Sequence, residues 1–388
     1  MARDRFTEVT SVSWFGRLKR SVGGVVFGLL LLVVATIGLF WNEGRAVTTA
    51  RSLAEGKGLV VSVDAGTIDR ANEGRLVHVA APVTLDGEVA DDVFPVRAAA
   101  IRLVRRVEMY QWRQSSQSET RKTLGGGEET VTTYSYDKVW QEGRIDSSDF
   151  REPSGHDNPS LPVESRTVSA ASARLGAFRI DEGVLDQVGS ERPLAVDAAR
   201  ADDFAAALGD GRRARVVGGE VRIGTDPDRP AVGDLRIRFA TVPPGPVSAI
   251  GRQTGDGLSA YQTESGDALL MAEDGTVAAD VMFAHAESAN TTLTWVIRLV
   301  GVLATWIGFA LVLGPLSVVF DVIPFLGSLV GFGTGLVAAV LTAVTAPVVI
   351  AVAWFWYRPL VSLAVLAVAG LLVAFLMWRG RARAATAT

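Results

Sequence analysis

Four long apolar runs constrain the fold of this chain more than any other feature of its sequence. They cover residues 22–41, 295–320, 325–356 and 360–378. A helix needs about 17–25 apolar residues to cross the hydrocarbon of a bilayer, so each run can form one transmembrane helix. The sequence therefore predicts an α+β integral membrane protein. Four transmembrane helices would carry a large, strand-dominated extracytoplasmic domain, residues 42–294, inserted between the first and second helix.

The distribution of charge predicts how the chain is oriented. The first run is longer than the apolar region of a signal peptide, and no small-residue cleavage site follows it, which predicts an uncleaved signal anchor. The tails at residues 1–21 and 379–388 are basic, and the positive-inside rule places both in the cytoplasm. Residues 42–294 are acidic. An acidic domain lacks the basic surface that nucleic acid requires, so the expected partners include no nucleic acid.

A ridge of small side chains recurs every four residues along the third apolar run. In lipid, such a ridge lets a second helix approach closely, and this packing drives helix association. The partner helix could belong to the same chain or to a second copy. The run is also longer than one straight span, so we expect it to tilt, to begin at the interface, or to kink at Pro347. The ridge consists of Gly327, Gly331, Gly335, Ala339 and Ala343.

The segment between the first two runs reads mainly as strands. Residues 101–110 alternate in polarity with period 2, and residues 131–140 are rich in Thr, Tyr and Val, as strands are. The polar, glycine-containing stretch 114–129 between them predicts the mobile tip of a long β-hairpin. Further strands are expected at 216–223, 235–239 and 247–252, and helices at 197–208 and 281–289.

No pattern in the sequence predicts a catalytic site, a bound cofactor or a metal site. The chain has no cysteine and only three histidines, and it lacks the common motifs of serine hydrolases, zinc proteases and phosphate-binding loops. His156 lies beside Asp157 in a loop, where it either makes a structural hydrogen bond or takes part in catalysis. The aromatic residues of the predicted hairpin either pack across strands or line a groove. They are Tyr110, Trp112, Tyr134, Tyr136 and Trp140.

Several short strings occur together in a characteristic order, and through them the chain resembles the transmembrane protein 43 (LUMA) family. The strings run from the first apolar run to the last. They include Asn42-Glu43-Gly44-Arg45, Asn72-Glu73-Gly74-Arg75, His156-Asp157-Asn158-Pro159 and Tyr357-Arg358-Pro359. Because Asn and Gly favour turns, we expect the first string to form a turn that fixes the domain on the bilayer, and the second to precede a strand.

The resemblance implies a four-span protein with no established catalytic residues. It also implies self-association and a role in organising membranes together with other membrane proteins. Eukaryotic members of the family lie in the endoplasmic reticulum and inner nuclear membranes. The arginine-rich composition is typical of a bacterial genome, and a bacterial chain of this kind would lie in the plasma (inner) membrane.

Together, these features predict a multi-pass membrane scaffold that is not an enzyme and that contacts the lipid bilayer, copies of itself and other membrane proteins. One alternative is an extracytoplasmic domain, anchored to the membrane, that binds a lipid or another ligand or acts as an enzyme. A second alternative is a channel or transporter subunit. The absence of charge in the middle of the spans argues against the second, because Arg298 and Asp321 both lie near span ends.

Overall fold

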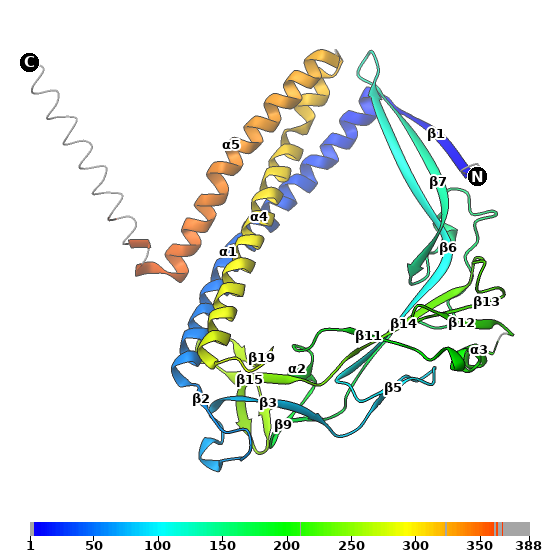
Figure 1. Ribbon diagram of the computed structural model, residues 1–388. Helices are drawn as coiled ribbons and strands as arrows, with labels where there is room; N and C mark the ends of the chain where they lie inside the picture. Colours follow the sequence, from blue (N-terminus) through cyan, green and yellow to red (C-terminus); the bar gives the residue numbers. More distant parts are fainter. Residues whose placement is uncertain (1–3, 210, 323, 361, 364–366, 368–388) are drawn as a thin grey trace, which may run out of the picture.

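The computed structural model describes residues 4–209, 211–322, 324–360, 362, 363 and 367. It is an α+β structure with a strand-rich central domain and three helices that are long and apolar enough to cross a membrane. These helices are α1 (Trp14–Leu59), α4 (Ala279–Phe320) and α5 (Pro324–Tyr357), and they lie side by side (Figure 1). The predicted fourth span, 360–378, and the tail 379–388 lie almost wholly outside the described residues.

The helices extend well beyond the apolar runs. The first, α1, has 46 residues and begins after Ser13, whose side chain accepts a hydrogen bond from the Gly16 amide. It continues without a break through Asn42-Glu43-Gly44-Arg45, so the turn predicted for this string is wrong. Likewise, the helix predicted at 281–289 is the first part of α4, and α5 continues through Pro347.

Glycines allow α1 and α4 to cross closely. A Cβ atom placed on Gly28 would lie 2.8 Å from the carbonyl oxygen of Gly308, and one on Gly308 would lie 2.8 Å from Cγ of Leu32. Any side chain at these two positions would force the helix backbones apart. On α5, the small residues that are buried within the chain are Ala338, Thr342, Ala346 and Ala353.

The larger sheet of the domain is mainly antiparallel and contains the predicted hairpin. Its main order is β1-β7-β6-β14-β13-β12, with β8 paired to β6 and β11 to β14. Its buried face holds a core that includes Val107, Ile237 and Phe239 and is covered partly by Phe204 of α3 (Ala201–Leu208). The strands are β1 (Asp4–Val12), β6 (Arg102–Lys122), β7 (Glu128–Glu142), β8 (Arg166–Ser169), β11 (Arg192–Leu194), β12 (Arg213–Val217), β13 (Glu220–Gly224) and β14 (Leu235–Val242).

The second sheet lies next to the helices and encloses a separate core around Val77, Leu175 and Phe178. Its order is β19-β15-β16-β10-β9-β3-β2, with an additional pairing of β15 to β3. Its strands are β2 (Val61–Ser62), β3 (Leu76–Leu85), β9 (Ala173–Leu175), β10 (Phe178–Ile180), β15 (Pro246–Thr254), β16 (Gly257–Ser259) and β19 (Met271–Asp274). The remaining elements are β4 (Val89–Ala90), β5 (Arg97–Ala98), β17 (Tyr261–Gln262), β18 (Ala268–Leu269), α2 (Glu182–Leu185) and 3-10 turns at Arg70–Asn72, Ser147–Asp149 and Ala198–Arg200.

The long hairpin is present, but its strands run much further than predicted. Residues 108–122 of β6 pair with 128–142 of β7, so the strands include most of the stretch expected to be a mobile tip. Cross-strand hydroxyl pairs accompany the extension, such as Ser118 with Thr132 at 2.9 Å and Thr120 with Thr130 at 3.0 Å. Only residues 123–127 form the turn.

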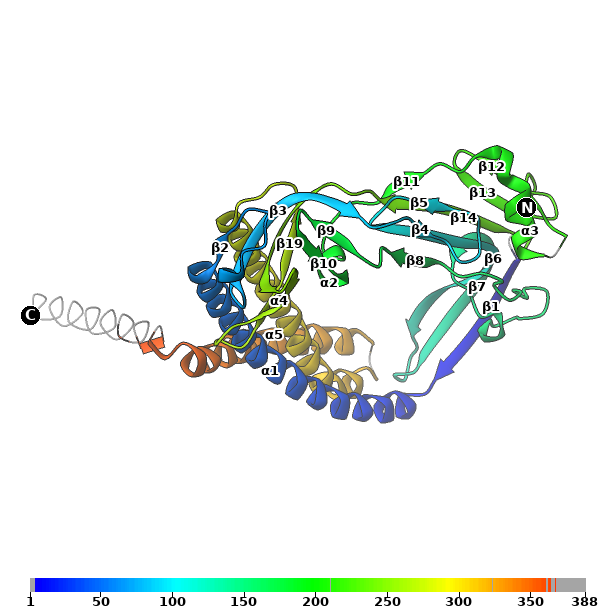
Figure 2. The same cartoon turned by 90° about the horizontal axis from the view of Figure 1, so that it is seen from below.

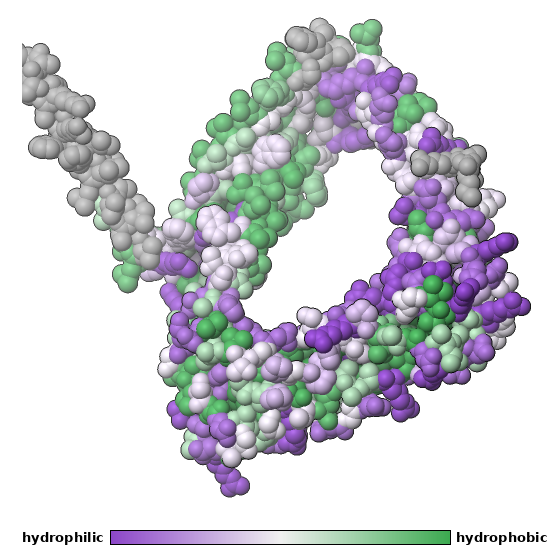
Figure 3. Space-filling view, viewed as in Figure 1, coloured by the Kyte–Doolittle hydropathy of each residue, from purple (hydrophilic) through white to green (hydrophobic). Residues whose placement is uncertain are grey.

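Together, the helices, the domain and the hairpin form a closed ring. Figure 3 shows a wide opening between the apolar helices and the polar hairpin, and Figure 2 shows the larger sheet lying away from the helices. The N-terminal strand β1 pairs along its full length with β7, from Asp4 opposite Tyr136 to Val12 opposite Glu128.

This pairing places residues 4–12 of the predicted N-terminal tail in a strand. Residues 4–12 form an edge strand of the domain and not a free basic tail. Because hydrocarbon cannot lie between two strands that share hydrogen bonds, residues 4–12 and residues 128–136 lie on the same side of a bilayer while they are paired.

Candidate functional site

A buried carboxylate joins the three helices where they leave their apolar segments. Glu43 of α1 is 2% exposed. Its two oxygens accept hydrogen bonds from Arg298 of α4 at 2.7 and 2.8 Å, and one of them also accepts a bond from the indole Nε1 of Trp354 on α5 at 2.8 Å. One side chain thereby connects all three helices through charge-assisted bonds.

Two tryptophans hold the guanidinium of Arg298 in place. Its Cζ atom lies 4.7 Å from the ring centroid of Trp295 and 5.8 Å from that of Trp354. Both distances fall within the range of cation–π attraction. Arg298 is therefore fixed by an ion pair and by aromatic rings, and it forms the floor of this junction.

The rest of the first family string strengthens the same junction. Asn42 donates to the carbonyl oxygen of Thr294 at 3.2 Å, and Arg45 donates to the side chains of Asn290 at 2.9 Å and of Thr294 at 3.0 Å. All these contacts link α1 to α4. The string therefore stabilises the junction as part of the continuous helix α1, and not as the turn that was predicted.

Gly44 has a steric role in the string. A Cβ atom at Gly44 would lie 2.6 Å from the ring of Tyr357, so a side chain there would displace the end of α5. Tyr357 also packs against Phe40, with ring centroids 5.3 Å apart. Glycine is the residue that lets α5 approach α1 at this level.

A cavity of about 500 Å³ opens between the three helices beside the Glu43–Arg298 pair. Glu287 and Asn290 of α4 and Arg358 at the end of α5 contribute polar groups to its wall. The cavity therefore lies at the height where the apolar surface of the helices meets the domain.

A second ion-pair cluster closes the ring at the other end of the helices. Asp321, in the turn between α4 and α5, is 1% exposed and lies 2.5 Å from Arg17 of α1 and 2.7 Å from Lys122 of β6. Arg17 also donates to the Gly126 carbonyl oxygen at 2.7 Å and pairs with Glu128 at 3.1 Å. The hairpin tip is thus docked on the helix ends through Asp321 and Arg17.

The ionised carboxylate of Asp321 contributes to this closure. Burial alone raises the pKa of its carboxyl, but hydrogen bonds and charges from Lys122 and Arg17 outweigh burial and hold the pKa below its usual range. Because the folded pKa is lowered, the stabilisation is fully present above the unfolded value of 3.8 and is lost as the pH falls through the folded value.

In the closed form, we expect the hairpin tip to stay docked at neutral pH and to detach as the pH falls below 3.8 through the lowered pKa of Asp321. The chain has no cysteine, so spin labels on Leu124→Cys and Lys19→Cys would report the distance between tip and helix without background. In Asp321→Asn, we expect a long distance at every pH. A short distance that persists in this variant would show that the ion cluster does not hold the tip.

The second family string forms the entry to β3. Gly74 has a φ of +77°, and its amide donates to the Gln253 carbonyl oxygen at 2.9 Å. The carboxylate of Glu73 accepts from the Gly255 amide at 3.0 Å, and Arg75 donates to Asn72 at 3.3 Å. These contacts attach the turn before β3 to the hairpin between β15 and β16. The second string therefore stabilises a different part of the protein from the first string, which begins 30 residues earlier in the sequence.

The loop string lies against the base of the long hairpin. His156 is 4% exposed, and its ring stacks on Tyr136 with centroids 4.0 Å apart and meets the edge of Trp112 at 4.7 Å. Asn158 acts like a strand partner, because it accepts from the Trp112 amide at 2.8 Å and donates to the Trp112 carbonyl oxygen at 2.9 Å. Pro159 packs next to Gly233.

These contacts give the loop string a structural role. His156 Nδ1 lies 2.9 Å from the carbonyl oxygen of Glu152, which orients the ring within its own loop. Within residues 4–209, 211–322 and the described part beyond them, no group of three or more His, Asp or Glu side chains is arranged to hold a metal ion.

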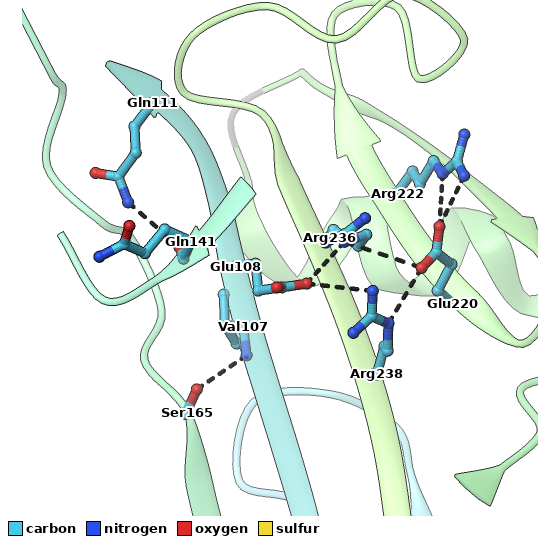
Figure 4. A network of polar contacts seen from close by, with 9 residues as sticks. All are labelled: Val107, Glu108, Gln111, Gln141, Ser165, Glu220, Arg222, Arg236 and Arg238. Atoms are coloured by element: carbon cyan, nitrogen blue, oxygen red, sulfur yellow. Dashed lines mark hydrogen bonds and ion pairs between the residues drawn. The ribbon is translucent and has the colours of Figure 1, made fainter. Parts of the chain in front are cut away.

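Charged side chains also alternate across the outer face of the larger sheet (Figure 4). Glu108 pairs with Arg236 at 2.7 Å, and Glu220 pairs with Arg222 at 2.7 Å and with Arg238 at 3.2 Å. Burial raises the pKa of Glu220, but Arg222 and Arg238 lower it by more. The network spans β6, β14 and β13 and stabilises their register.

Comparison with known proteins identifies relatives over nearly the whole chain. The family profile for Transmembrane protein 43 matches residues 109–359. Transmembrane protein 43 of Rattus norvegicus is 32% identical over 382 residues, which cover 92% of this chain and 91% of the relative. The Homo sapiens protein of that name is 33% identical over 380 residues, with the same coverage, and the Drosophila melanogaster homolog is 29% identical over 349 residues, covering 87% and 89%. No solved structure matches the chain.

Proposed function

The chain belongs to the transmembrane protein 43 family, and from this membership and its geometry we propose that it is a multi-pass membrane scaffold. It is an integral membrane protein whose apolar helices expose many large side chains along their length. In this proposal the helices anchor the protein and bind further copies, while the domain presents a fixed surface to other membrane proteins.

The observation that carries this proposal is the rigid attachment of the domain to the helices. Both α1 and α4 pass without interruption from their apolar segments into the domain, where Met282 and Phe283 of α4 join Leu53 of α1 in a buried cluster. The junction at Glu43 then fixes α5 to the same pair. A domain held in this way keeps a constant position relative to the helices, as a scaffold requires.

The outward side of α5 offers a surface for self-association. Ala339 and Ala343 of the small-residue ridge are exposed in the single chain, and a Cβ atom on Gly335 would meet nothing within 4 Å. The small residues that pack inside the chain lie on another side of the same helix, at Ala338 and Ala346. In the proposal, the outward part of the ridge, at Ala339 and Ala343, packs against a second copy in lipid.

Replacing Ala343 with leucine is expected to weaken self-association by about tenfold or more, because the larger side chain separates two helices that meet on small residues. The measurement is the mass of the full-length protein in mild detergent, by light scattering with the detergent subtracted. Val337→Leu, at an exposed position on another face of α5, should keep the mass of the unmodified protein. A monomeric unmodified protein, or an unchanged oligomer in Ala343→Leu, would refute the role of the ridge.

The proposal also includes an orientation. This orientation belongs to an open form of the chain, with both ends in the cytoplasm and the domain on the far side. In that form β1 has left β7 and the tip has left Arg17 and Asp321, because hydrocarbon would separate these groups. The membrane would be the plasma membrane in a bacterial cell and the endoplasmic reticulum or inner nuclear membrane in a eukaryotic one.

A further inference from the structure

We propose that the cavity beside the Glu43–Arg298 pair binds the headgroup of a zwitterionic phospholipid. The phosphate would lie at Arg358 and the positively charged amine at Glu287. Both residues contribute to the wall of the same cavity, whose volume of about 500 Å³ is large enough for a headgroup.

The position of the cavity identifies a membrane lipid as the ligand. It lies where the three helices leave their apolar segments, and its wall includes Trp295, which is 62% exposed. Trp356, which lies between the wall residues Trp354 and Arg358 in the sequence, is 74% exposed. Exposed tryptophans at the ends of transmembrane helices mark the headgroup layer of a bilayer. A ligand in this cavity is therefore at the depth where phospholipid headgroups are found.

The charges of the cavity favour a zwitterion over an anion. Glu43 and Arg298 neutralise each other through two short hydrogen bonds. Among the residues that the structure describes, Glu287 and Arg358 form no ion pair. One free negative group and one free positive group on the same wall match the amine and the phosphate of a zwitterionic headgroup, whereas a purely anionic headgroup would meet Glu287 as a like charge.

The floor of the cavity is already organised for a ligand. Arg298 is fixed by Glu43 and two tryptophans, and Asn290 is held by Arg45 on one side and by the Ala46 carbonyl oxygen on the other. Arg358 itself is half-buried at the end of α5, where its amide donates to the Trp354 carbonyl oxygen at 2.7 Å. Binding therefore orders few groups, which reduces its entropic cost.

The test is native mass spectrometry of the full-length protein after reconstitution in equal amounts of phosphatidylethanolamine, phosphatidylcholine and phosphatidylglycerol. We expect one retained lipid per chain, with the two zwitterionic lipids favoured over phosphatidylglycerol by about tenfold. Arg358→Gln should lower retention of all three lipids by about tenfold. Glu287→Gln should keep total retention but remove the preference over phosphatidylglycerol.

Two controls make the outcome decisive. Arg97→Gln removes a positive charge from an exposed residue of β5 outside the cavity wall and should leave retention unchanged. Glycerophosphoethanolamine, which has no acyl chains, should compete weakly, and equally strong competition would identify a soluble phosphate compound as the ligand. Phosphatidylglycerol retained as well as the zwitterionic lipids, or an Arg358→Gln protein that retains lipid normally and keeps its unfolding temperature, would overturn the proposal.

Discussion

Replacing Glu43 with alanine is expected to lower the free energy of unfolding by about 3–5 kcal/mol, because removing one partner of a buried ion pair leaves the other charge without compensation. Arg298, whose side chain is 15% exposed, would keep its charge beside two tryptophans with no carboxylate to accept its hydrogen bonds. The indole N–H of Trp354 would lose its acceptor as well. This one change therefore removes the hydrogen bonds of α1 to α4 and to α5.

The measurement is reversible unfolding of the full-length protein in detergent micelles, followed by the fluorescence of the junction tryptophans. Glu43→Leu combined with Arg298→Leu removes both charges and should recover much of the loss. Glu119→Ala removes a carboxylate from an exposed pair with Arg121 and should change stability too little to resolve. A Glu43→Ala protein as stable as the Glu119→Ala protein would show that the junction does not hold the helices together.

The second large effect concerns the N-terminal strand. Cysteines at Thr7 and Thr133, or at Phe6 and Tyr134, are expected to form a disulfide in nearly every molecule of the closed ring, because these residues are directly opposite in the pairing of β1 with β7. Opposite residues in antiparallel strands have Cα atoms about 4.5–5.5 Å apart, within the range that a disulfide spans. Since narrow and wide pairs alternate, one of these two pairs has the closer spacing.

The absence of native cysteine makes this test unambiguous. Thr7→Cys with Thr130→Cys is the matched control, because it is three residues out of register, about 10 Å along the strand, and should not form the bond. If neither in-register pair reacts in membranes while the protein remains folded, residues 4–12 lie away from the domain. This result would favour the predicted orientation with separated sides.

The features that the sequence predicted are those that depend on local pattern. Apolar runs found the three described helices because a span needs continuous apolar residues. Alternation with β-branched and aromatic residues found the hairpin of β6 and β7.

The junction was missed because local turn preference and tertiary packing favour different structures at residues 42–45. Asn42 and Gly44 suit a turn when they are considered alone. In the structure, contacts to Thr294 and Tyr357, more than 250 residues away, favour helix at the same positions. A useful signal was available, since Glu43 and Arg298 are opposite charges next to the ends of two apolar runs, where unpaired charge is costly.

The pairing of β1 with β7 has a consequence for how the protein is made. Residues 128–136 leave the ribosome after residues 4–12 by about 6–25 s at ordinary synthesis rates. The apolar part of α1 emerges within this interval, before β7 is made. Its insertion determines on which side of the membrane residues 4–12 lie. The ring can therefore close only in copies whose first strand is still on the domain's side when β7 appears.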